Sequence, residues 1–535
     1  MKSQDELGVP LPANKPLVVR TIKRVTKEQR EYALKKTEYN MFSFPADLLF
    51  LDFLSDSGSG SMTDSQWAAL FLGDESYGRN TGYYILLDAI RDIFERGDAP
   101  KKLINLILYG ESDIKKLMDN VYLASNEGGF VNGGVFQLIR PNAFIVPQGR
   151  CAEYLLFSTI APILKEKNSS IEYYIPNNGH FDTTEANIAA NNIHPVNLFS
   201  ANLMDEFHID QMDKSNPFKG NMNINKLKEI VQEKGVDSIP LIFITITNNT
   251  VAGQPVSMGN IRDVYEIAKK YQIPLFFDAC RFPENASFIK EFEDKYQNYS
   301  IQRIIKEMFS YVDGFTISFK KGLANIGGGL FFRDQGIFHK KFSINEDIGI
   351  LLKEKQILTF GNDSYGGMSG RDIIALASSL YEVVDLNALN KRIFLVREFA
   401  RKLAEKGVPV ILPPGGHAVY IDMDKFFDGI DMKIDDFGGV GFTIELLKHY
   451  GIRACELGPF AFEWDKKTPE ERKGILNLVR FAIPWNAYYI SHIDYAVAAI
   501  SELYRNRDKI PKVIISRGAE LRLRHFQTGL QPIYQ

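Results

Sequence analysis

The chain has 535 residues, and its 45% of hydrophobic and 24% of charged residues are typical of a globular protein with a large core. Its 63 lysines and arginines nearly balance its 66 aspartates and glutamates, and the net charge of -3 argues against a nucleic-acid-binding or membrane-surface protein. No uncharged apolar run approaches the roughly 18 residues of a membrane helix, and the polar first residues favour no secretory signal. Three widely spaced cysteines indicate neither a disulfide framework nor a cysteine-rich zinc site, so we expect a cytoplasmic protein.

The first part of the chain is predicted to be an arm. It covers residues 1 to about 45 and contains a charged helical stretch from Lys27 to Lys36. A loop rich in serine and glycine, residues 55–61, separates this arm from the helical sequence that follows. The segment of about 96–140 is expected to be an inserted surface subdomain, because insertions lie on surfaces.

The middle of the chain alternates between strands and helices. Residues 242–244 and 275–277 form short apolar runs that predict buried parallel strands, and the amphipathic stretch 258–271 between them predicts a helix. This alternation indicates a parallel sheet wrapped by helices, and such sheets bind ligands at the carboxyl ends of their strands. The third region, about 375–535, indicates a smaller domain of α/β or α+β type.

An acid and a lysine follow two of the predicted strands. Asp278 ends the run 275–277, and Lys320 and Lys321 follow the strand-like residues 315–317. Pyridoxal phosphate (PLP) requires this pairing, because a lysine amine forms an imine with its aldehyde and a carboxylate stabilises its protonated pyridine nitrogen. Taken singly, a strand-terminal aspartate is more often a turn or cap residue, and a lysine pair is usually solvated surface charge.

The segment from Gln148 to Arg150 opens a helical stretch. Backbone N–H groups at a helix start, with Gly149 allowing close approach, suit a phosphate. Arg150 is equally compatible with a surface ion pair.

With these segments in view, the chain resembles the tryptophanase/tyrosine phenol-lyase family of PLP-dependent β-eliminating lyases. Characteristic stretches are QGRCAE, PLFFDACRFPENASFIKE and MFSYVDGFTISFKKGLANIGGGL. The matching segments occur in family order at 54–77, 148–153, 248–261, 274–291, 308–330, 364–372, 415–422, 451–458, 479–484 and 523–526.

The resemblance implies an α/β protein of fold type I, like aspartate aminotransferase. It has a large, mostly parallel-sheet domain and a smaller α+β domain. Residues 1–60 would form the N-terminal arm and part of the small domain, 61–370 the large PLP-binding domain with the 96–140 insertion, and 371–535 the C-terminal small domain.

The resemblance also assigns a set of residues to the cofactor. The residues expected to hold the PLP phosphate are Gln148, Gly149, Arg150 and Ser318. Phe181 would stack on the ring, Asn249 and Arg281 would contact the side of the ring hydroxyl, and Asp278 would contact the ring nitrogen.

Catalysis is expected to depend on a second set. Lys321 would be the Schiff-base lysine and the base that removes the substrate α-proton, assisted by Lys320. Arg480 would bind the substrate α-carboxylate through its bidentate fork, and Tyr77 would donate a proton to the leaving group.

Two further family properties concern a cation and the assembly. Glu75, with the backbone carbonyls of Gly58 and Asn325, would match a monovalent-cation site that suits potassium. The resemblance also implies a homotetramer with active sites at a dimer interface.

Three positions favour tryptophan over tyrosine as the substrate. Leu457 stands where phenol-lyases carry an arginine, and Asp182 and His525 are tryptophanase-like. The expected reaction is β-elimination of L-tryptophan to indole, pyruvate and ammonium. Tyrosine or another β-substituted amino acid is the alternative substrate, and a non-catalytic PLP-fold relative is the alternative of a different class. The chain departs from the family at Pro147, where the family has histidine, and at Trp485, where it has arginine.

Overall fold

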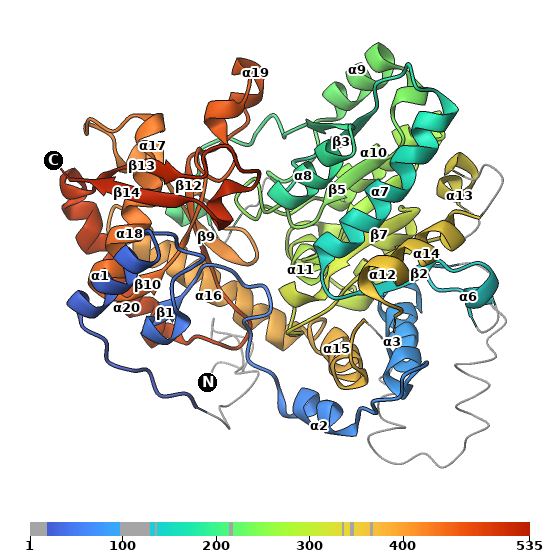
Figure 1. The fold of residues 1–535 in the computed structure, drawn as a ribbon, viewed down its shortest axis with the longest axis horizontal. Helices are drawn as coiled ribbons and strands as arrows, with labels where there is room; N and C mark the ends of the chain where they lie inside the picture. Colours follow the sequence, from blue (N-terminus) through green and yellow to red (C-terminus); the bar gives the residue numbers. More distant parts are fainter. Residues whose placement is uncertain are drawn as a thin grey trace.

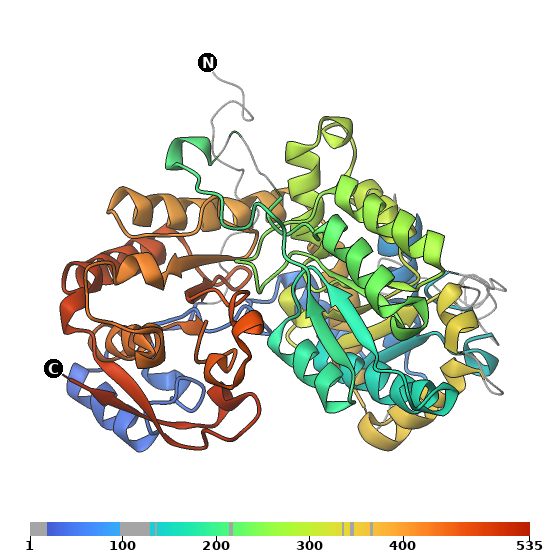
Figure 2. The same cartoon turned by 90° about the horizontal axis from the view of Figure 1, so that it is seen from above.

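The computed structural model describes residues 19–96, 129–133, 136–212, 214, 218–333, 336–342, 347–363 and 367–534. Most of the expected insertion at 96–140 lies outside these ranges. Within them, none of the helices combines the length and the apolar character that crossing a bilayer requires. The chain forms two lobes, which both Figure 1 and the view from above in Figure 2 show side by side.

The large lobe is built on a five-stranded sheet in the order β2-β8-β7-β6-β5. Strands β5, β6 and β7 are parallel, and β8 is antiparallel to both of its neighbours. A separate parallel pair, β3-β4, belongs to the same lobe. The seven strands are β2 (Ala143–Val146), β3 (Tyr174–Asn177), β4 (His194–Asn197), β5 (Ile242–Thr245), β6 (Leu275–Asp278), β7 (Gly314–Ser318) and β8 (Gly328–Phe332). The strands predicted at 242–244 and 275–277 are therefore confirmed.

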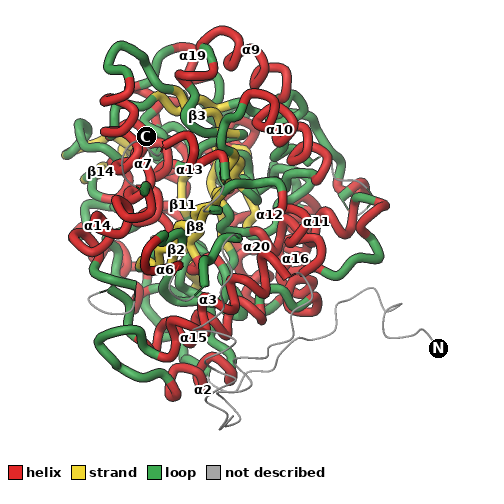
Figure 3. The backbone as a smooth tube through the Cα atoms, turned by 90° about the vertical axis from the view of Figure 1, so that its right-hand side faces the viewer, coloured by secondary structure: helices red, strands yellow, loops and turns green. Residues whose placement is uncertain are grey.

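Helices cover both faces of this sheet, because successive side chains of a strand point to opposite faces. Phe276 packs into one core with α7, whereas Leu275 and Phe277 pack into the other. The helices of the first core are α7 (Gly149–Lys167), α8 (Asp182–Ala190), α13 (Ile337–Phe342) and α14 (Ile348–Phe360). The helices of the second are α2 (Asp64–Leu72), α3 (Thr81–Arg91), α9 (Ile224–Lys234), α10 (Met258–Tyr271), α11 (Phe282–Phe292), α12 (Ile301–Ser310) and α15 (Gly370–Glu382). Figure 3 shows α2 and α15 together at one end of the molecule.

The small lobe contains three small sheets. Its centre is the antiparallel sheet β11-β12-β9, and the pairs β1-β10 and β13-β14 lie beside it. Its strands are β1 (Leu51–Asp52), β9 (Ala418–Asp422), β10 (Ile452–Arg453), β11 (Cys455–Leu457), β12 (Leu478–Ala482), β13 (Lys512–Arg517) and β14 (Gly529–Ile533). Its helices are α1 (Lys27–Lys36), α16 (Leu386–Glu405), α17 (Met423–Phe426), α18 (Gly438–Tyr450), α19 (Pro469–Arg472) and α20 (Ile490–Arg505). Since β1 pairs with β10 and α1 packs on α18, the beginning of the described chain contributes to this lobe.

Short helical segments connect the longer elements. They lie at Ala46–Leu48, Asp92–Arg96, Phe136–Ile139, Ile209–Gln211, Val236–Ser238, Asp294–Tyr296, Phe319–Lys321, Ile434–Asp436, Trp464–Lys466, Arg507–Lys509 and Arg524–Phe526. The segment Phe319–Lys321 follows β7 directly, so it is fixed by the sheet.

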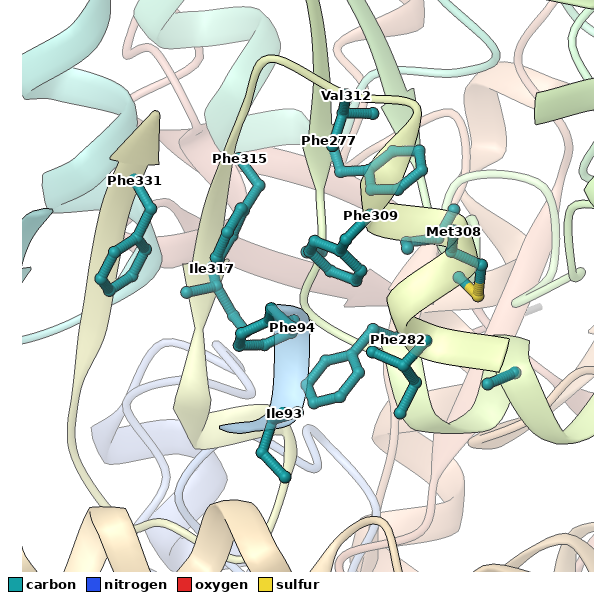
Figure 4. Close-up of a cluster of buried hydrophobic side chains, with 14 of the residues drawn as sticks. Ile93, Phe94, Phe277, Phe282, Met308, Phe309, Val312, Phe315, Ile317 and Phe331 are labelled. Atoms are coloured by element: carbon teal, nitrogen blue, oxygen red, sulfur yellow. The ribbon is translucent and has the colours of Figure 1, made fainter. Parts of the chain in front are cut away.

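A cluster of phenylalanines fills the core beneath β6 and β7 (Figure 4). Phe94 lies at its centre, with ring centroids 4.8 Å from Phe282, 4.4 Å from Phe309 and 4.9 Å from Phe315. Its side chain is 1% exposed. Aromatic rings in such tilted and edge-to-face contacts stabilise a core beyond their buried area.

Replacing Phe94 with alanine should therefore lower the free energy of unfolding by about 3–5 kcal/mol, because the cavity cannot close fully. Urea unfolding followed by circular dichroism measures this change. Tyr32→Ala is the control, since Tyr32 is 66% exposed, and surface substitutions change stability by about 0.5 kcal/mol or less. Equal effects of the two substitutions would show that the cluster does not stabilise the fold.

Candidate active site

The carboxyl ends of β6 and β7 bring the predicted acid and lysine to one edge of the sheet. Asp278 is the last residue of β6 and pairs in register with Thr316 of β7. Strand β7 ends two residues later at Ser318, and Lys321 follows in the short helix Phe319–Lys321. The charge of Lys321 acts on the pKa of Asp278, so the two groups share one environment.

Desolvation dominates the acid–base properties of this edge. Burial lowers the pKa of the Lys321 amine to about 8, although the carboxylate of Asp56 acts in the opposite direction. Burial raises the pKa of the Asp278 carboxyl, and the Cys280 thiol, which donates to its Oδ1 at 3.0 Å, offsets this only in part. The neutral amine is therefore more accessible than in a solvated lysine, and a positive partner would favour the ionised form of Asp278.

A second buried carboxyl lies near Asp278. Burial and the negative charge of Asp278 raise the pKa of Glu153 to about 7. The Thr184 hydroxyl donates to its Oε1 at 2.6 Å. Glu153 lies on α7, four residues after its first residue, Gly149, so the helix that begins beside β7 carries this carboxyl to the site.

The start of α7 packs tightly against β7 and β8. A Cβ atom on Gly149 would lie 2.8 Å from the Cβ of Ser318, and one on Gly328 would lie 2.3 Å from the backbone carbon of Gln148. Gln148 is the N-cap residue, but its side chain makes no capping hydrogen bond. The N–H groups of the first two residues, Gly149 and Arg150, can therefore bind an anion at this edge, whereas the Cys151 N–H donates to the Gln148 carbonyl at 3.1 Å. Arg150 is exposed, and its guanidinium carbon lies 5.5 Å from the ring centre of Phe526.

Arg480 reaches the site from β12 of the small lobe. Its Nη1 donates to Asn249 Oδ1 at 3.2 Å, and its Nη2 donates to the Leu54 carbonyl at 2.8 Å. The same Asn249 oxygen accepts from the Tyr420 hydroxyl at 2.6 Å and lies 3.0 Å from His417 Nε2. The Nε of Arg480 is buried and has no partner within the part of the chain that the structure describes. The guanidinium is thus held in place with a donor left for a ligand.

A buried ion network lies behind these residues. Asp56 accepts two hydrogen bonds from Arg281, at 3.0 and 2.8 Å, and one from Arg392 at 3.0 Å. Arg392 Nε lies 2.7 Å from a carboxylate oxygen of Glu284. Burial would raise the pKa of Asp56, but the Arg281 guanidinium holds it well below its usual range. The network joins the segment before α2 with α11 and α16.

Two of the three residues expected to distinguish indole from phenol form a buried pair. Asp182 Oδ2 lies 3.1 Å from His525 Nε2, and both side chains are 4% exposed. Burial would raise the pKa of Asp182, yet the bond to His525 brings it below its ordinary value. The charges of Arg480 and Asp182 both act on the buried thiol of Cys455, which places the pair near the Arg480 end of the site. Leu457 is buried in β11 opposite Leu478.

Other predicted residues lie close to the site or at the surface. Phe181 is half-buried and immediately precedes α8, beside Asp182. Lys320 is half-buried, and burial lowers its pKa. Tyr77 is 76% exposed, so within one chain its ring is turned to solvent.

Two of the three cation-site residues lie together. The Gly58 N–H donates to the Lys320 carbonyl at 2.7 Å, and a Cβ on Gly58 would lie 2.7 Å from the Asn325 carbonyl oxygen. Glu75 instead forms an ion pair with Arg371 at 2.5 Å, and both side chains are largely exposed.

Sequence reasoning missed several residues of the site. His417 and Tyr420 lie in the matched segment 415–422, which was a usable signal for them. Asp56 lies in a loop that reads as a spacer, and Arg392 lies in an ordinary amphipathic helix. Asp56 lies in the matched segment 54–77, but no local pattern pairs it with Arg392, because 336 residues separate them.

Comparison with known proteins gives a consistent match. A sequence profile of β-eliminating lyases matches residues 52–499. A probable β-eliminating lyase of Trichomonas vaginalis is 36% identical over 96% of this chain and 97% of its own length. A tryptophanase of Salinibacter ruber is 34% identical over 96% of this chain and 94% of its own. A tyrosine phenol-lyase of Pasteurella multocida is 34% identical over 98% and 99% of the two chains.

Solved structures share the fold at low sequence identity. Substrate-bound BacF from Bacillus subtilis superposes with a TM-score of 0.50 at 15% identity, over 91% of this chain and 96% of that one. A serine palmitoyltransferase from Sphingomonas wittichii gives 0.50 at 11% identity, over 90% and 96%. Together with the mostly parallel sheet, these likenesses confirm the expected fold class, fold type I.

The low pKa of Lys321 predicts an unusual reactivity. In the cofactor-free protein, an amine-acylating reagent should modify Lys321 half-maximally near pH 8, because only the neutral amine reacts, whereas solvated lysines titrate near about 10.4. Peptide mapping across a pH series measures the modification, and the exposed Lys228 sets the baseline. Half-maximal modification of Lys321 near about pH 10.4, the value for a solvated lysine, would show that its amine is not desolvated.

Proposed function

This chain belongs to the β-eliminating lyase family, and from that premise we propose that it cleaves L-tryptophan to indole, pyruvate and ammonium. Membership confirms the resemblance seen in the sequence, and it makes the protein a lyase. Family and fold imply PLP as the cofactor. The observation that carries the choice of substrate is the buried pair of Asp182 and His525 near Arg480.

The residues at the sheet edge fit PLP. This cofactor needs an amine for its aldehyde, a carboxylate for its ring nitrogen and an anion site for its phosphate. The desolvated amine of Lys321 and the buried carboxyl of Asp278 supply the first two. The uncapped start of α7, which lies close to Gly149 and Gly328, supplies the third. Once bound, PLP supplies an electron sink for the α-carbon of the amino acid. The residues we propose to hold it are Lys321, Gln148, Gly149, Arg150, Phe181, Asn249, Asp278, Arg281 and Ser318.

Arg480 and Lys321 would act on the amino-acid part of the substrate. The buried Nε of Arg480 leaves a donor for the α-carboxylate, and its other nitrogens are fixed by Asn249 and the Leu54 carbonyl. With a pKa of about 8, Lys321 is close to the range in which a base both accepts and releases a proton at neutral pH. We assign it the removal of the α-proton, with Lys320 as its helper.

The Asp182–His525 pair supports indole as the leaving group. Asp182 holds the His525 ring by one nitrogen, and the rings of Phe42 and Phe526 lie 5.5 and 4.1 Å from it. Leu457 offers no charge to a phenolate. A site with apolar rings and one buried Asp–His pair suits indole, which is larger and less polar than phenol. Tyrosine is the second candidate, because a relative named tyrosine phenol-lyase is as similar as the tryptophanase.

A panel of amino acids tests the proposal. The PLP-loaded protein should release pyruvate from tryptophan with stoichiometric indole, and faster than from tyrosine or S-substituted cysteines.

His525→Phe should lower kcat/KM for tryptophan by roughly 10²-fold, the lower range for a positioned proton-transfer group. Lys321→Ala should abolish both turnover and the visible absorption band of the bound cofactor. We expect less activity when sodium replaces potassium, because Gly58 and Asn325, which lie together, are proposed cation ligands.

Two outcomes would contradict this assignment. Strong tyrosine turnover without indole formation would make phenol the leaving group. Retention of the visible band by Lys321→Ala would remove Lys321 from its role.

The exposed position of Tyr77 supports a shared site between subunits. Tyr77 follows α2, whose side chains Trp67 and Phe71 are 48% and 82% exposed and lie one helical turn apart. We propose a homotetramer in which a second copy covers this face, so that Tyr77 donates its proton in the neighbouring subunit's site.

Mixing two inactive variants tests this arrangement. Tyr77→Phe and Lys321→Ala homo-oligomers should each be inactive, whereas unfolding and refolding them together should restore activity, because some mixed sites contain both intact residues. The indole assay measures the recovery, and light scattering gives the oligomeric state. Absence of recovery from mixed oligomers would place Tyr77 and Lys321 of one chain in the same site.

A further inference from the structure

Trp485 occupies a place in the site that the proposed reaction does not use. It follows β12 by three residues and is 2% exposed. In the sequence it departs from the arginine that is usual in the family. At this position the indole contacts Lys321 through its N–H and Arg392 through its ring face.

The indole N–H of Trp485 bonds the residue that carries the reactive amine. Nε1 donates to the backbone carbonyl of Lys321 at 3.1 Å. Arg480 lies five residues earlier in the same stretch of chain, at the centre of β12. One short segment therefore holds the Arg480 guanidinium at one end and the Lys321 backbone at the other.

The face of the indole is fixed as well. The Arg392 guanidinium carbon lies 4.7 Å from the ring centre of Trp485. Arg392 is itself immobilised by Asp56, by Glu284 and by the Ile483 carbonyl, to which its Nη1 donates at 2.8 Å. A cation over an indole in a dry environment is a favourable contact. The Trp485 ring therefore packs against a buried guanidinium, that of Arg392, which three other groups hold in place.

The backbone of Trp485 is held by the segment before α2. Its carbonyl accepts from the Ser61 N–H at 2.9 Å, and a Cβ on Gly60 would lie 3.0 Å from the same oxygen. Trp485 packs in the core of the large lobe, whereas Ile483, two residues before it, packs in the core of the small lobe. The chain passes from one lobe to the other at this residue.

We propose that Trp485 is a positioning residue that fixes Lys321 relative to Arg480. Its observed contacts are with Lys321, Arg392 and Ser61. Its indole N–H fastens the backbone of Lys321 to the strand that carries Arg480, and Arg392 keeps the ring from rotating. The inference rests on the proposed function, because it assigns a purpose to the spacing between the amine and the carboxylate-binding guanidinium.

Trp485→Phe tests this role, because phenylalanine keeps an aromatic face for Arg392 but has no N–H. Trp464→Phe is the matched control, since Trp464 also lies against an arginine, with the Arg472 guanidinium carbon 4.0 Å from its ring centre. The readouts are the PLP dissociation constant, the pH at which the visible band titrates, kcat and KM for tryptophan, and hydrogen exchange of the amides of residues 319–322.

For Trp485→Phe we expect the PLP dissociation constant to rise about five- to tenfold, as for loss of one hydrogen bond of typical net strength. The pH at which the visible band titrates should differ from that of the wild type. The value of kcat should fall by a larger factor than KM rises, because a displacement of Lys321 relative to Arg480 changes the reacting geometry. Exchange of the 319–322 amides should accelerate in the cofactor-free protein. The Trp464→Phe protein should match the wild type in all four readouts.

A second substitution separates the hydrogen bond from ring packing. Trp67→Phe and Trp464→Phe together leave Trp485 as the one tryptophan of the chain. Benzothienylalanine at position 485 of this double variant replaces only the N–H with sulfur. It should reproduce the Trp485→Phe changes when compared with the double variant that keeps Trp485. Unchanged exchange, titration and kcat in that folded protein would overturn the inference. A wild-type protein that neither binds PLP nor releases pyruvate would instead refute the proposed function, while the exchange experiment would still report on Trp485.

Discussion

The carboxylate of Asp56 is the fixed point on which the site depends. It is fully buried and holds the guanidinium groups of Arg281 and Arg392, which come from the start of α11 and from the middle of α16. Removing one partner of such a buried network costs about 3–5 kcal/mol, because an uncompensated charge is left behind. Three separate parts of the chain are therefore obliged to meet at one carboxylate, and Lys321, Trp485 and Arg480 lie around that meeting point.

The same desolvation shifts the pKa values of the two groups at the sheet edge in opposite directions. It favours the neutral form of the Lys321 amine and disfavours the charged form of the Asp278 carboxyl. The first effect makes a nucleophile and base, and the second leaves a carboxyl whose ionised form needs a nearby cation. A protonated pyridine nitrogen bound at this edge would stabilise the ionised form of Asp278. Burial shifts the pKa values of Lys321 and Asp278 more than any single hydrogen bond does.

Much of this arrangement could be predicted from the sequence because it depends on local order along the chain. The runs before Asp278 and Lys321 are short, apolar and rich in β-branched or aromatic residues, and parallel strands place their ends together. The links through Asp56, Arg392 and Trp485 could not be predicted, because they join residues 91 to 336 positions apart and no local pattern tells which residue pairs with which. Glu75 illustrates the same limit, since its acid side chain pairs with Arg371 rather than with the two predicted carbonyl ligands. Sequence order thus predicts which groups share a sheet edge, and tertiary packing decides which of them bond.

The close packing around Gly149 and Gly328 has an evolutionary consequence. Neither position has room for a methyl group, because the neighbouring atoms belong to Ser318 and to the backbone of Gln148. A descendant that lost its cofactor would still have to keep both glycines in order to fold, since α7 could not otherwise lie against β7 and β8. These glycines are therefore poor markers of retained activity across a lineage. Drift at Lys321 and Asp278, the residues assigned to the chemistry, would be the earlier sign that the chemistry had been abandoned.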